Sequence, residues 1–232
     1  MASLTAKRKE ARLQATYRDS DLVSTREYNI TLCGAVLWGV FFNYLLCDSV
    51  GNVLDFVDPV TFFVGYFVLC IAGVLIAAKS DDAVISFIGY NMVVLPVGLV
   101  ISTCVELYGG LDSSIVAEAF LITLCITGAM MIMAIAKPEW CETFEYFLLP
   151  CLAGLVLAEL FMLLLGYSNI ATAWIGAIIF SLYIAYDVFR SQEYAKTKNN
   201  AVDCAMDIYL DIANLFLRIL QILGKSKGGS RR

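Results

Sequence analysis

A series of seven hydrophobic segments, joined by short polar loops, constrains this chain most strongly. Each segment is close to the ~20 residues that an α-helix needs to cross the hydrocarbon core of a bilayer. We therefore predict an all-α membrane protein with a single transmembrane domain, residues 28–224. The seven predicted spans are residues 28–46, 59–78, 83–105, 113–136, 144–166, 170–189 and 201–224.

The composition agrees with this class of protein. Of the 232 residues, 60% are hydrophobic and 16% are charged, whereas soluble proteins are roughly half apolar and a quarter charged. The loops are too short for a soluble catalytic domain, so function has to lie among the helices. The eight cysteines form no Cys-x-x-Cys pair and the chain has no histidine, which argues against a zinc site. We expect no enzymatic activity, no cofactor and no nucleic-acid partner.

The basic residues predict an orientation in the membrane. Residues 1–27 form a polar tail with six Lys and Arg, and the positive-inside rule places this tail in the cytoplasm. Across the first six spans, inside segments hold 11 Lys and Arg and outside loops hold none. The basic tail, residues 225–232, breaks this pattern if the last helix crosses. We favour a seventh crossing over a last helix that re-enters and returns, because late charges dominate topology less often than early ones.

The last hydrophobic segment carries an unusual polar stripe. Its polar residues follow one another at intervals of four, four, three and four, so they share one side of a helix. They are Asp203, Asp207, Asp211, Asn214 and Arg218. An ionised carboxylate facing lipid costs on the order of 3 kcal/mol or more at mid-bilayer. We therefore predict that this helix is the centre of the bundle and that the six other helices surround it.

Asp187 and Asp211 are the principal site candidates, and we call them the acid pair. Position 199, expected in the turn between the last two helices, is twelve residues from each. In an antiparallel hairpin, residues equidistant from the turn lie at the same depth, which would place both acids side by side inside the membrane. The alternative is structural: Asp187 would be a helix-end residue at the interface, and Asp211 a buried acid with satisfied hydrogen bonds.

Two such carboxylates would form a pH-sensitive gate. At about 4 Å and an effective dielectric near 20, two anions repel by roughly 4 kcal/mol, so the pair would share one proton near neutral pH. Loss of that proton would leave two anions that repel each other and attract a divalent cation with hard oxygen ligands. We therefore expect protons and a transiently bound divalent cation at this pair.

Further polar residues are candidates to support the acid pair or line a pore. Asp207 would extend the acidic path toward the inside, and Arg218 would hold Asn214 or a carboxylate from another helix. Glu159 lies deep in the fifth span, with functional and structural roles both open. For Glu118, in the fourth span, we favour a place at the outer interface.

Around the two acids the sequence resembles the transmembrane Bax inhibitor motif family. The family pattern has Ala-Tyr-Asp at the end of the sixth span, then Leu-Tyr-Leu-Asp, Asn-Leu-Phe and a Leu-rich close. Here it stands as Ala-Tyr-Asp at residues 185–187, Ile-Tyr-Leu-Asp at 208–211, Asn-Leu-Phe at 214–216 and a hydrophobic close at 219–224. The seven spans, short loops and basic N-terminal tail also agree with the family, and a prokaryotic member suits the short tail.

The resemblance implies a pH-sensitive calcium leak channel in which two triplets of helices surround the seventh. It gives Asp187 and Asp211 the role of a proton-sharing latch near the cytoplasmic side, with calcium as the permeant ion. A prokaryotic member would lie in the inner membrane. Family members can carry a basic residue in the second span that pairs with the latch. Residues 59–78 hold no Lys or Arg, and Arg190 or Arg218 are the candidates to replace it.

Two other functions use the same acids. A proton-coupled transporter would use them as a relay, and a broken helix would support that reading. An intramembrane aspartyl protease would share a proton between them to activate water, but its Gly-x-Gly-Asp and Pro-Ala-Leu signatures are absent. A pH-dependent calcium leak is the function that the sequence favours.

Overall fold

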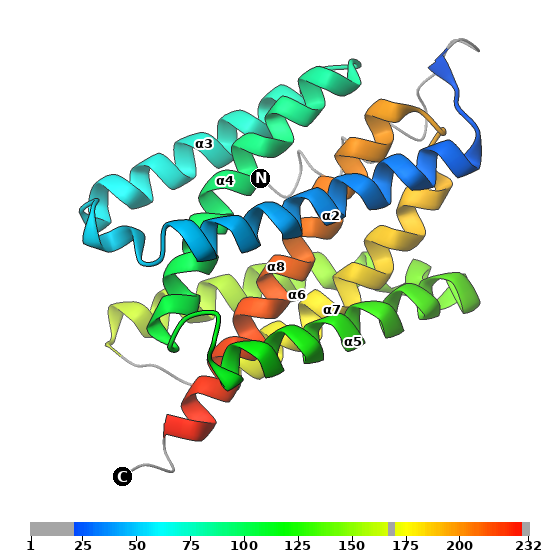
Figure 1. Cartoon of the computed structure of the whole chain (residues 1–232). Coiled ribbons are helices and arrows are strands. Elements are labelled where there is room, and N and C mark those ends of the chain that lie inside the picture. Colours follow the sequence, from blue (N-terminus) through cyan, green and yellow to red (C-terminus); the bar gives the residue numbers. More distant parts are fainter. Residues whose placement is uncertain (1–20, 167–169, 229–232) are drawn as a thin grey trace. The chain divides into compact units, whose positions relative to one another are not determined.

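The computed structural model describes residues 21–166 and 170–228, and this part of the chain is helical (Figure 1). A short 3-10 helix, η2 (Val53–Asp55), follows the first long helix. In the described residues the β-structure is limited to one antiparallel bridge between Leu22 and Thr197. The seven long helices are α2 (Thr25–Ser49), α3 (Pro59–Lys79), α4 (Ala83–Leu107), α5 (Ser114–Ala136), α6 (Pro138–Leu164), α7 (Ile170–Glu193) and α8 (Lys198–Gly228). The described residues thus contain the seven helices that we predicted.

Six of the described helices, α2 to α7, are long and apolar enough to cross a membrane. Many of their large hydrophobic side chains are exposed, among them Phe63, Phe120 and Leu164. A soluble protein rarely leaves large contiguous apolar surface uncovered, whereas lipid requires such a surface. The chain is therefore an all-α, multi-pass membrane protein, as the composition predicts.

Helix α6 begins earlier than predicted. We expected an inside turn over residues 137–142 and a span from residue 144, but α6 starts at Pro138 and Lys137 alone separates it from α5. Proline is well placed at the first position of a helix, where its missing N–H group costs no intrahelical hydrogen bond. Cys141, expected in the turn, is fully buried within this first part of α6.

The connection between α7 and α8 is also shorter than expected. We predicted a connection over residues 190–200, but α7 continues to Glu193 and α8 begins at Lys198. Thr197 sets the start of α8, because its hydroxyl accepts a hydrogen bond of 3.1 Å from the backbone N–H of Asn200. A threonine that accepts from the third residue of a helix is a common N-terminal cap.

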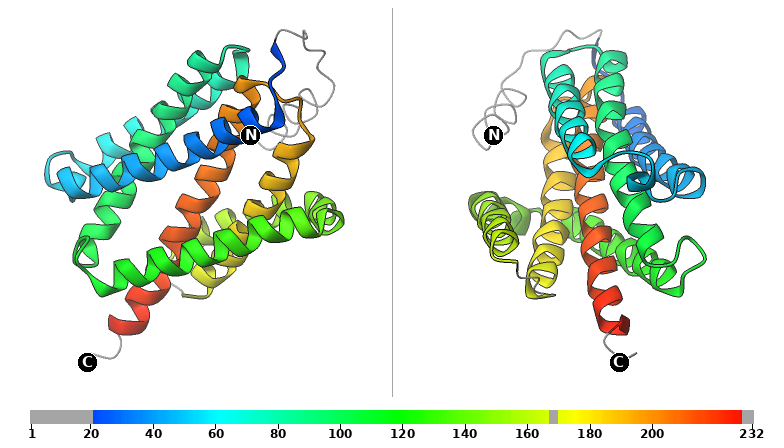
Figure 2. Two further views of the ribbon diagram at one scale, coloured as in Figure 1. Left: turned by 45° about the vertical axis from the view of Figure 1, so that its right-hand side comes forward. Right: turned by 90° about the vertical axis from the view of Figure 1, so that its left-hand side faces the viewer.

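The helices divide into two units. The first unit contains residues 21–107 and Arg190–Tyr209, and so includes α2, α3, α4 and the start of α8. In it α3 and α4 run side by side (Figures 1 and 2), because two glycines let their backbones meet. A Cβ atom on Gly73 would lie 2.5 Å from the carbonyl oxygen of Gly89, which leaves no room for a side chain.

Buried tyrosines join α2, α4 and α8 within the first unit. The hydroxyl of Tyr90 donates to the carbonyl of Ala35 at 2.9 Å, and that of Tyr209 donates to Asn43 Oδ1 at 3.0 Å. The two rings meet edge to face, with their centroids 5.6 Å apart. Each hydroxyl is thus satisfied, as a buried polar group in a membrane protein requires.

The second unit contains residues 108–189 and 210–228, and so includes α5, α6, most of α7 and the second part of α8. A small hydrophobic cluster joins the end of α5, the start of α6 and the end of α7. Its buried members are Ala134, Cys141, Ala185 and Phe189. Near the end of α8, the ring of Tyr108 lies against Gly224, where a Cβ atom would meet ring atom Cδ1 at 2.6 Å.

Helix α8 is the helix that we expected at the centre of the bundle. None of its residues 200–222 is exposed, on either the polar or the apolar side. It is a single helix of 31 residues (Figure 2), which corresponds to about 46 Å at 1.5 Å per residue. The helix has no break in the middle, as a segment that re-enters and returns would need. However, α8 is not among the six described helices that are long and apolar enough to cross a membrane, so the seventh crossing stays a prediction.

Candidate functional site: buried acids on the last two helices

Asp187 and Asp211 are both buried, each with 8% of its surface exposed. Asp187 belongs to α7 and Asp211 to α8, and both lie in the second unit. Lipid-facing carboxylates are costly, and acids within membrane helices face the protein interior or water. The burial of both side chains agrees with a place inside the protein, and an exposed interfacial place for Asp187 does not fit the structure.

The register that we expected for the acid pair is wrong in one respect. Position 199 lies within α8, not in the turn. Asp187 is six residues before the last residue of α7, and Asp211 is thirteen residues after the first residue of α8. At 1.5 Å per residue these separations are about 9 Å and about 20 Å along the two axes. Contact between the two carboxylates therefore requires α7 and α8 to be offset or inclined, and it stays a prediction.

Asp203 is the most buried carboxylate in the described part of the chain, with 2% exposed. It belongs to the first unit, as does the half-buried Asp207 one turn later. The stripe spacing placed Asp203 on the same side of α8 as Asp211, but we did not select it as a site residue. The sequence feature that could have identified Asp203 is its separation of eight residues from Asp211, which is close to two helical turns.

Arg218 forms an ion pair with Glu159 of helix α6 in the second unit. The pair is bidentate: Nη1 donates to Oε1, and Nη2 donates to Oε2 at 2.9 Å. The Arg218 side chain is 19% exposed and that of Glu159 is 29% exposed. We expected Arg218 to hold Asn214 or a carboxylate from another helix, and the structure shows the carboxylate. Parallel N–H···O bonds of this kind fix the geometry as well as the charge.

The structure places the candidates Asn214, Arg190 and Glu118 in three different surroundings. The side-chain amide of Asn214 donates to the carbonyl of Leu210 in its own helix, at 2.8 Å. Arg190 lies in the first unit, where its Nη1 donates to Glu193 Oε2 at 2.6 Å. Glu118 is exposed near the start of α5, in agreement with the interfacial place that we favoured. A role for Arg190 as the basic partner of the acid pair stays a prediction.

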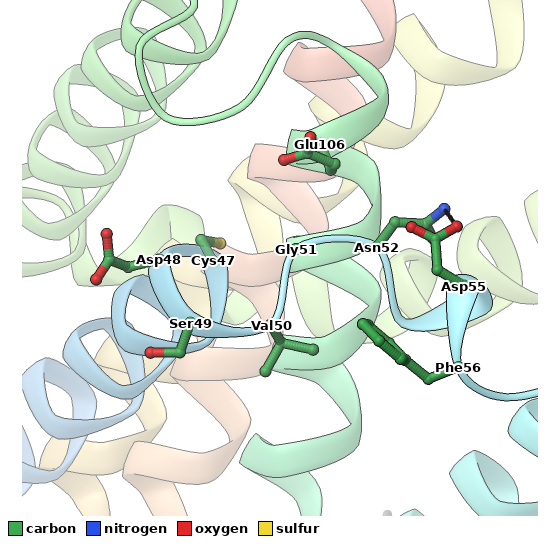
Figure 3. Close-up of a pocket in the computed structure, with 9 residues that line it drawn as sticks. All are labelled: Cys47, Asp48, Ser49, Val50, Gly51, Asn52, Asp55, Phe56 and Glu106. Atoms are coloured by element: carbon green, nitrogen blue, oxygen red, sulfur yellow. Dashed lines mark hydrogen bonds between the residues drawn. The ribbon is translucent and has the colours of Figure 1, made fainter.

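The first unit also has an acidic pocket at the end of α2. Figure 3 shows it with Asp48, Asp55 and Glu106 among the lining residues. These three carboxylates point apart, and that of Asp55 accepts a hydrogen bond from Asn52 at 2.9 Å. Within the described ranges, no group of three or more Asp, Glu, Cys or His side chains is placed to hold a metal ion.

Comparison with known proteins gives one family and several partial relatives. The family described as "Inhibitor of apoptosis-promoting Bax1" matches residues 24–228. An uncharacterized protein of Helicobacter pylori is 34% identical over 110 residues, which cover 46% of each chain. Inner membrane protein YbhL of Escherichia coli K12 is 27% identical over 141 residues, 56% of this chain and 59% of its own.

A fungal protein is similar over a shorter stretch. Bax inhibitor 1 of Saccharomyces cerevisiae is 44% identical over 61 residues, which are 25% of this chain and 19% of the yeast protein. The chain thus spans less than two thirds of the length of each of these curated relatives: 46%, 59% and 19%. The matches include both bacterial and fungal proteins.

Proposed function

The chain belongs to the family of inhibitors of apoptosis-promoting Bax1, and on that premise we propose that it is a pH-sensitive calcium leak channel. The observation that carries the proposal is the burial of Asp187 and Asp211 in the last two helices of one unit. Acids are rare inside membrane helices and most often serve ion pathways or proton relays. A purely structural helix pair would be more stable with neutral side chains at both positions.

The proton count of the acid pair would set the state of the channel. With one proton shared, the carboxylates hold α7 to α8 through a hydrogen bond and the route is closed. When the proton leaves, two anions in a medium of low dielectric repel each other. The helices then separate, water enters, and a divalent cation finds oxygen ligands on its way through. Asp207 would extend this acidic path toward the inside.

The basic residues and one relative together suggest the membrane in which the protein lies. The basic residues on the predicted inside segments favour a cytoplasmic N-terminus, and one relative is a named inner membrane protein. We place this chain in the plasma membrane of its cell, the inner membrane if the cell is bacterial. Calcium ions, protons and the lipid bilayer are its expected partners.

The proposal is tested by calcium flux into proteoliposomes that contain the purified protein and a trapped calcium dye. The wild type should leak calcium with a marked dependence on pH. Asp187→Asn and Asp211→Asn each place a neutral amide where the proton is shared, so each should flatten that dependence. Asp112→Asn, an exposed acid in the loop before α5, is the matched control and should keep the wild-type profile.

An unchanged pH profile in both Asn variants would refute the acid pair as the gate. Two alternatives have their own signatures in the same vesicles. A proton-coupled transporter would move protons in a fixed ratio to its substrate, and a protease would cleave peptides and lose that activity in either variant. The described helices are each continuous, so the broken helix that would favour a transporter is not among them.

A further inference from the structure

The Arg218–Glu159 ion pair lies at a different level from the acid pair. Arg218 is seven residues beyond Asp211 on α8, which is about 10 Å further along the axis. Glu159 is five residues before the last residue of α6, Leu164. The predicted orientation runs both helices from the inside to the outside, so the ion pair belongs to the outer half of the membrane.

The outer end of α6 has few other attachments. Its buried residues are Cys141, Leu148 and Leu155, and no side chain of residues 156–164 is buried. Within that stretch Glu159 and Met162 alone are half-buried, while the others are exposed. The bidentate ion pair is therefore the specific polar link between this end of α6 and the helix α8.

Helix α7 provides the space through which the arginine reaches α6. The Arg218 side chain passes over Gly176, where a Cβ atom would lie 2.9 Å from Nε and 3.0 Å from Cδ. Even a methyl group at position 176 would thus displace the guanidinium group. Glu159 on α6, Gly176 on α7 and Arg218 on α8 form one contact among three helices of the second unit.

We propose that the Arg218–Glu159 ion pair closes the outer end of the ion route by holding the outer end of α6 on α8. This inference rests on the proposed function, because it adds a second closure to the acid pair of the same channel. While the pair is intact, its two charges neutralise each other and leave no open path for water between the helices. When the pair breaks, α6 is free at this end, and the Glu159 carboxylate can face an entering cation.

The test uses three variants in the full chain and measures calcium leak at the pH at which the wild type leaks least. Glu159→Gln keeps the shape but removes the negative charge. Glu159→Gln combined with Arg218→Gln removes both charges without leaving either one alone. Gly176→Ala keeps both charges but moves the guanidinium group. Gly154→Ala is the matched control, because a Cβ atom there meets no other atom within 4 Å.

Each of the three variants should raise the leak about tenfold, which corresponds to about 1.4 kcal/mol. Hydrogen exchange of residues 156–164 should become faster in the same variants, and the Gly154→Ala control should match the wild type in both measurements. The leak should still respond to pH, because the acid pair is intact. Size-exclusion profiles and circular dichroism identify variants that fold. If Glu159→Gln does not fold, the double variant and Gly176→Ala decide.

Two results would overturn the outer closure. One is unchanged exchange of residues 156–164 in folded variants, which would mean that the ion pair does not hold α6. The other is faster exchange with an unchanged leak, which would mean that this end of α6 does not close the route. A leak that depends on Asp187 and Asp211 but not on Glu159 overturns this inference alone. A wild type that passes no calcium at any pH overturns the proposed function and the outer closure together.

Discussion

The hydroxyl of Tyr28, at the start of α2, donates a hydrogen bond of 2.8 Å to the carbonyl of Ser191, near the end of α7. The tyrosine is fully buried. Above its ring, at 4.5 Å from the centroid, lies the ammonium group of Lys196. Next to this contact, the backbone N–H of Val23 donates to the carbonyl of Lys196 at 2.8 Å. The start of α2 is thus attached to the connection between α7 and α8.

The Tyr28 hydroxyl should contribute a modest part of the stability of the first unit. Tyr28→Phe removes the hydroxyl, with its hydrogen bond to Ser191 and its weaker one to Cys204, and keeps the ring, so we expect a loss of about 1 kcal/mol. Tyr28→Ala also leaves a cavity and should cost about 3–5 kcal/mol. Thermal unfolding in detergent measures both, with the exposed Tyr146→Phe as the control. Equal melting temperatures for Tyr28→Phe and Tyr28→Ala would show that the ring does not pack as described.

Lys196 should make the stability of the protein increase as the pH rises through the alkaline range. Burial lowers the pKa of this lysine below its ordinary 10.5, against the smaller opposing effect of Cys204. The folded state therefore loses the proton before the unfolded state does. Loss of the Lys196 proton therefore stabilises the folded state. This gain is absent at neutral pH and appears as the pH rises from the folded-state pKa toward the ordinary pKa of lysine.

The measurement compares wild type and Lys196→Met in unfolding experiments across the alkaline range. The variant also loses hydrogen bonds to the carbonyls of Ser191 and Gln192, so its stability is lower throughout. The informative quantity is the difference between the two proteins, which should grow as the pH rises. A difference that is constant with pH would contradict the lowered pKa.

Asp58 should make the first turn of α3 sensitive to acid. Its carboxylate accepts hydrogen bonds from the backbone N–H groups of Val60 and Thr61, each at 3.0 Å. Hydrogen bonding to the Thr61 side chain, with these backbone bonds, lowers the pKa of Asp58 below its ordinary 3.8. The stability that this cap contributes is thus fully present at a pH above the unfolded-state pKa of Asp58. It is lost as the pH falls through the folded-state pKa.

Hydrogen exchange of the first turn of α3 checks this cap. Asp58→Ala should raise exchange at every pH, because the N–H groups of that turn lose their acceptor. Acidification should also raise exchange of this turn in the wild type, because Asp58 gains a proton. Asp58→Asn keeps an acceptor oxygen that does not titrate, so acidification should not raise exchange of the same turn in this variant. If wild type and Asp58→Asn show the same response to acid, Asp58 is not the titrating group.

Two glycines of α2 should respond in opposite ways to the same substitution. A Cβ atom on Gly39 would lie 2.7 Å from ring atom Cδ2 of Tyr209, so Gly39→Ala forces apart the packed tyrosines of the first unit. Gly34 has no atom within 4 Å of such a position, and alanine in a helix is favoured over glycine by roughly 0.5–1 kcal/mol. We expect Gly34→Ala to be neutral or stabilising and Gly39→Ala to destabilise by about 1–3 kcal/mol. Unfolding in detergent measures both, and similar melting temperatures would disagree with this packing.

The fold was largely predictable because hydrophobic length and charge determine where membrane helices lie. The ends of the helices were less predictable, because local capping decides them. Thr197 offered a capping signal before Asn199 and Asn200, and recognising it would have placed the start of α8 at Lys198. The expected position of residue 199 in the turn depended on that boundary and is wrong, so the equal depth of the acid pair no longer follows from counting residues.

The partner of Arg218 shows a different limit of sequence reasoning. The sequence predicted that Arg218 would bind Asn214 or a carboxylate from another helix, but it could not select Glu159. The choice depends on Gly176, a residue of a third helix that gives the arginine side chain its path. Such a contact is set by the packing of three segments, and spacing along one helix carries no information about it.

The Tyr28–Ser191 hydrogen bond has a consequence for biosynthesis. Its two ends are 163 residues apart in the chain, and ribosomes add roughly 5–20 residues per second. The first helix therefore waits on the order of ten seconds or more after its own synthesis before its polar partner exists. During that interval the phenol must find water, lipid headgroups or an assembly factor, and newly made chains halted before residue 191 should be the most vulnerable to degradation.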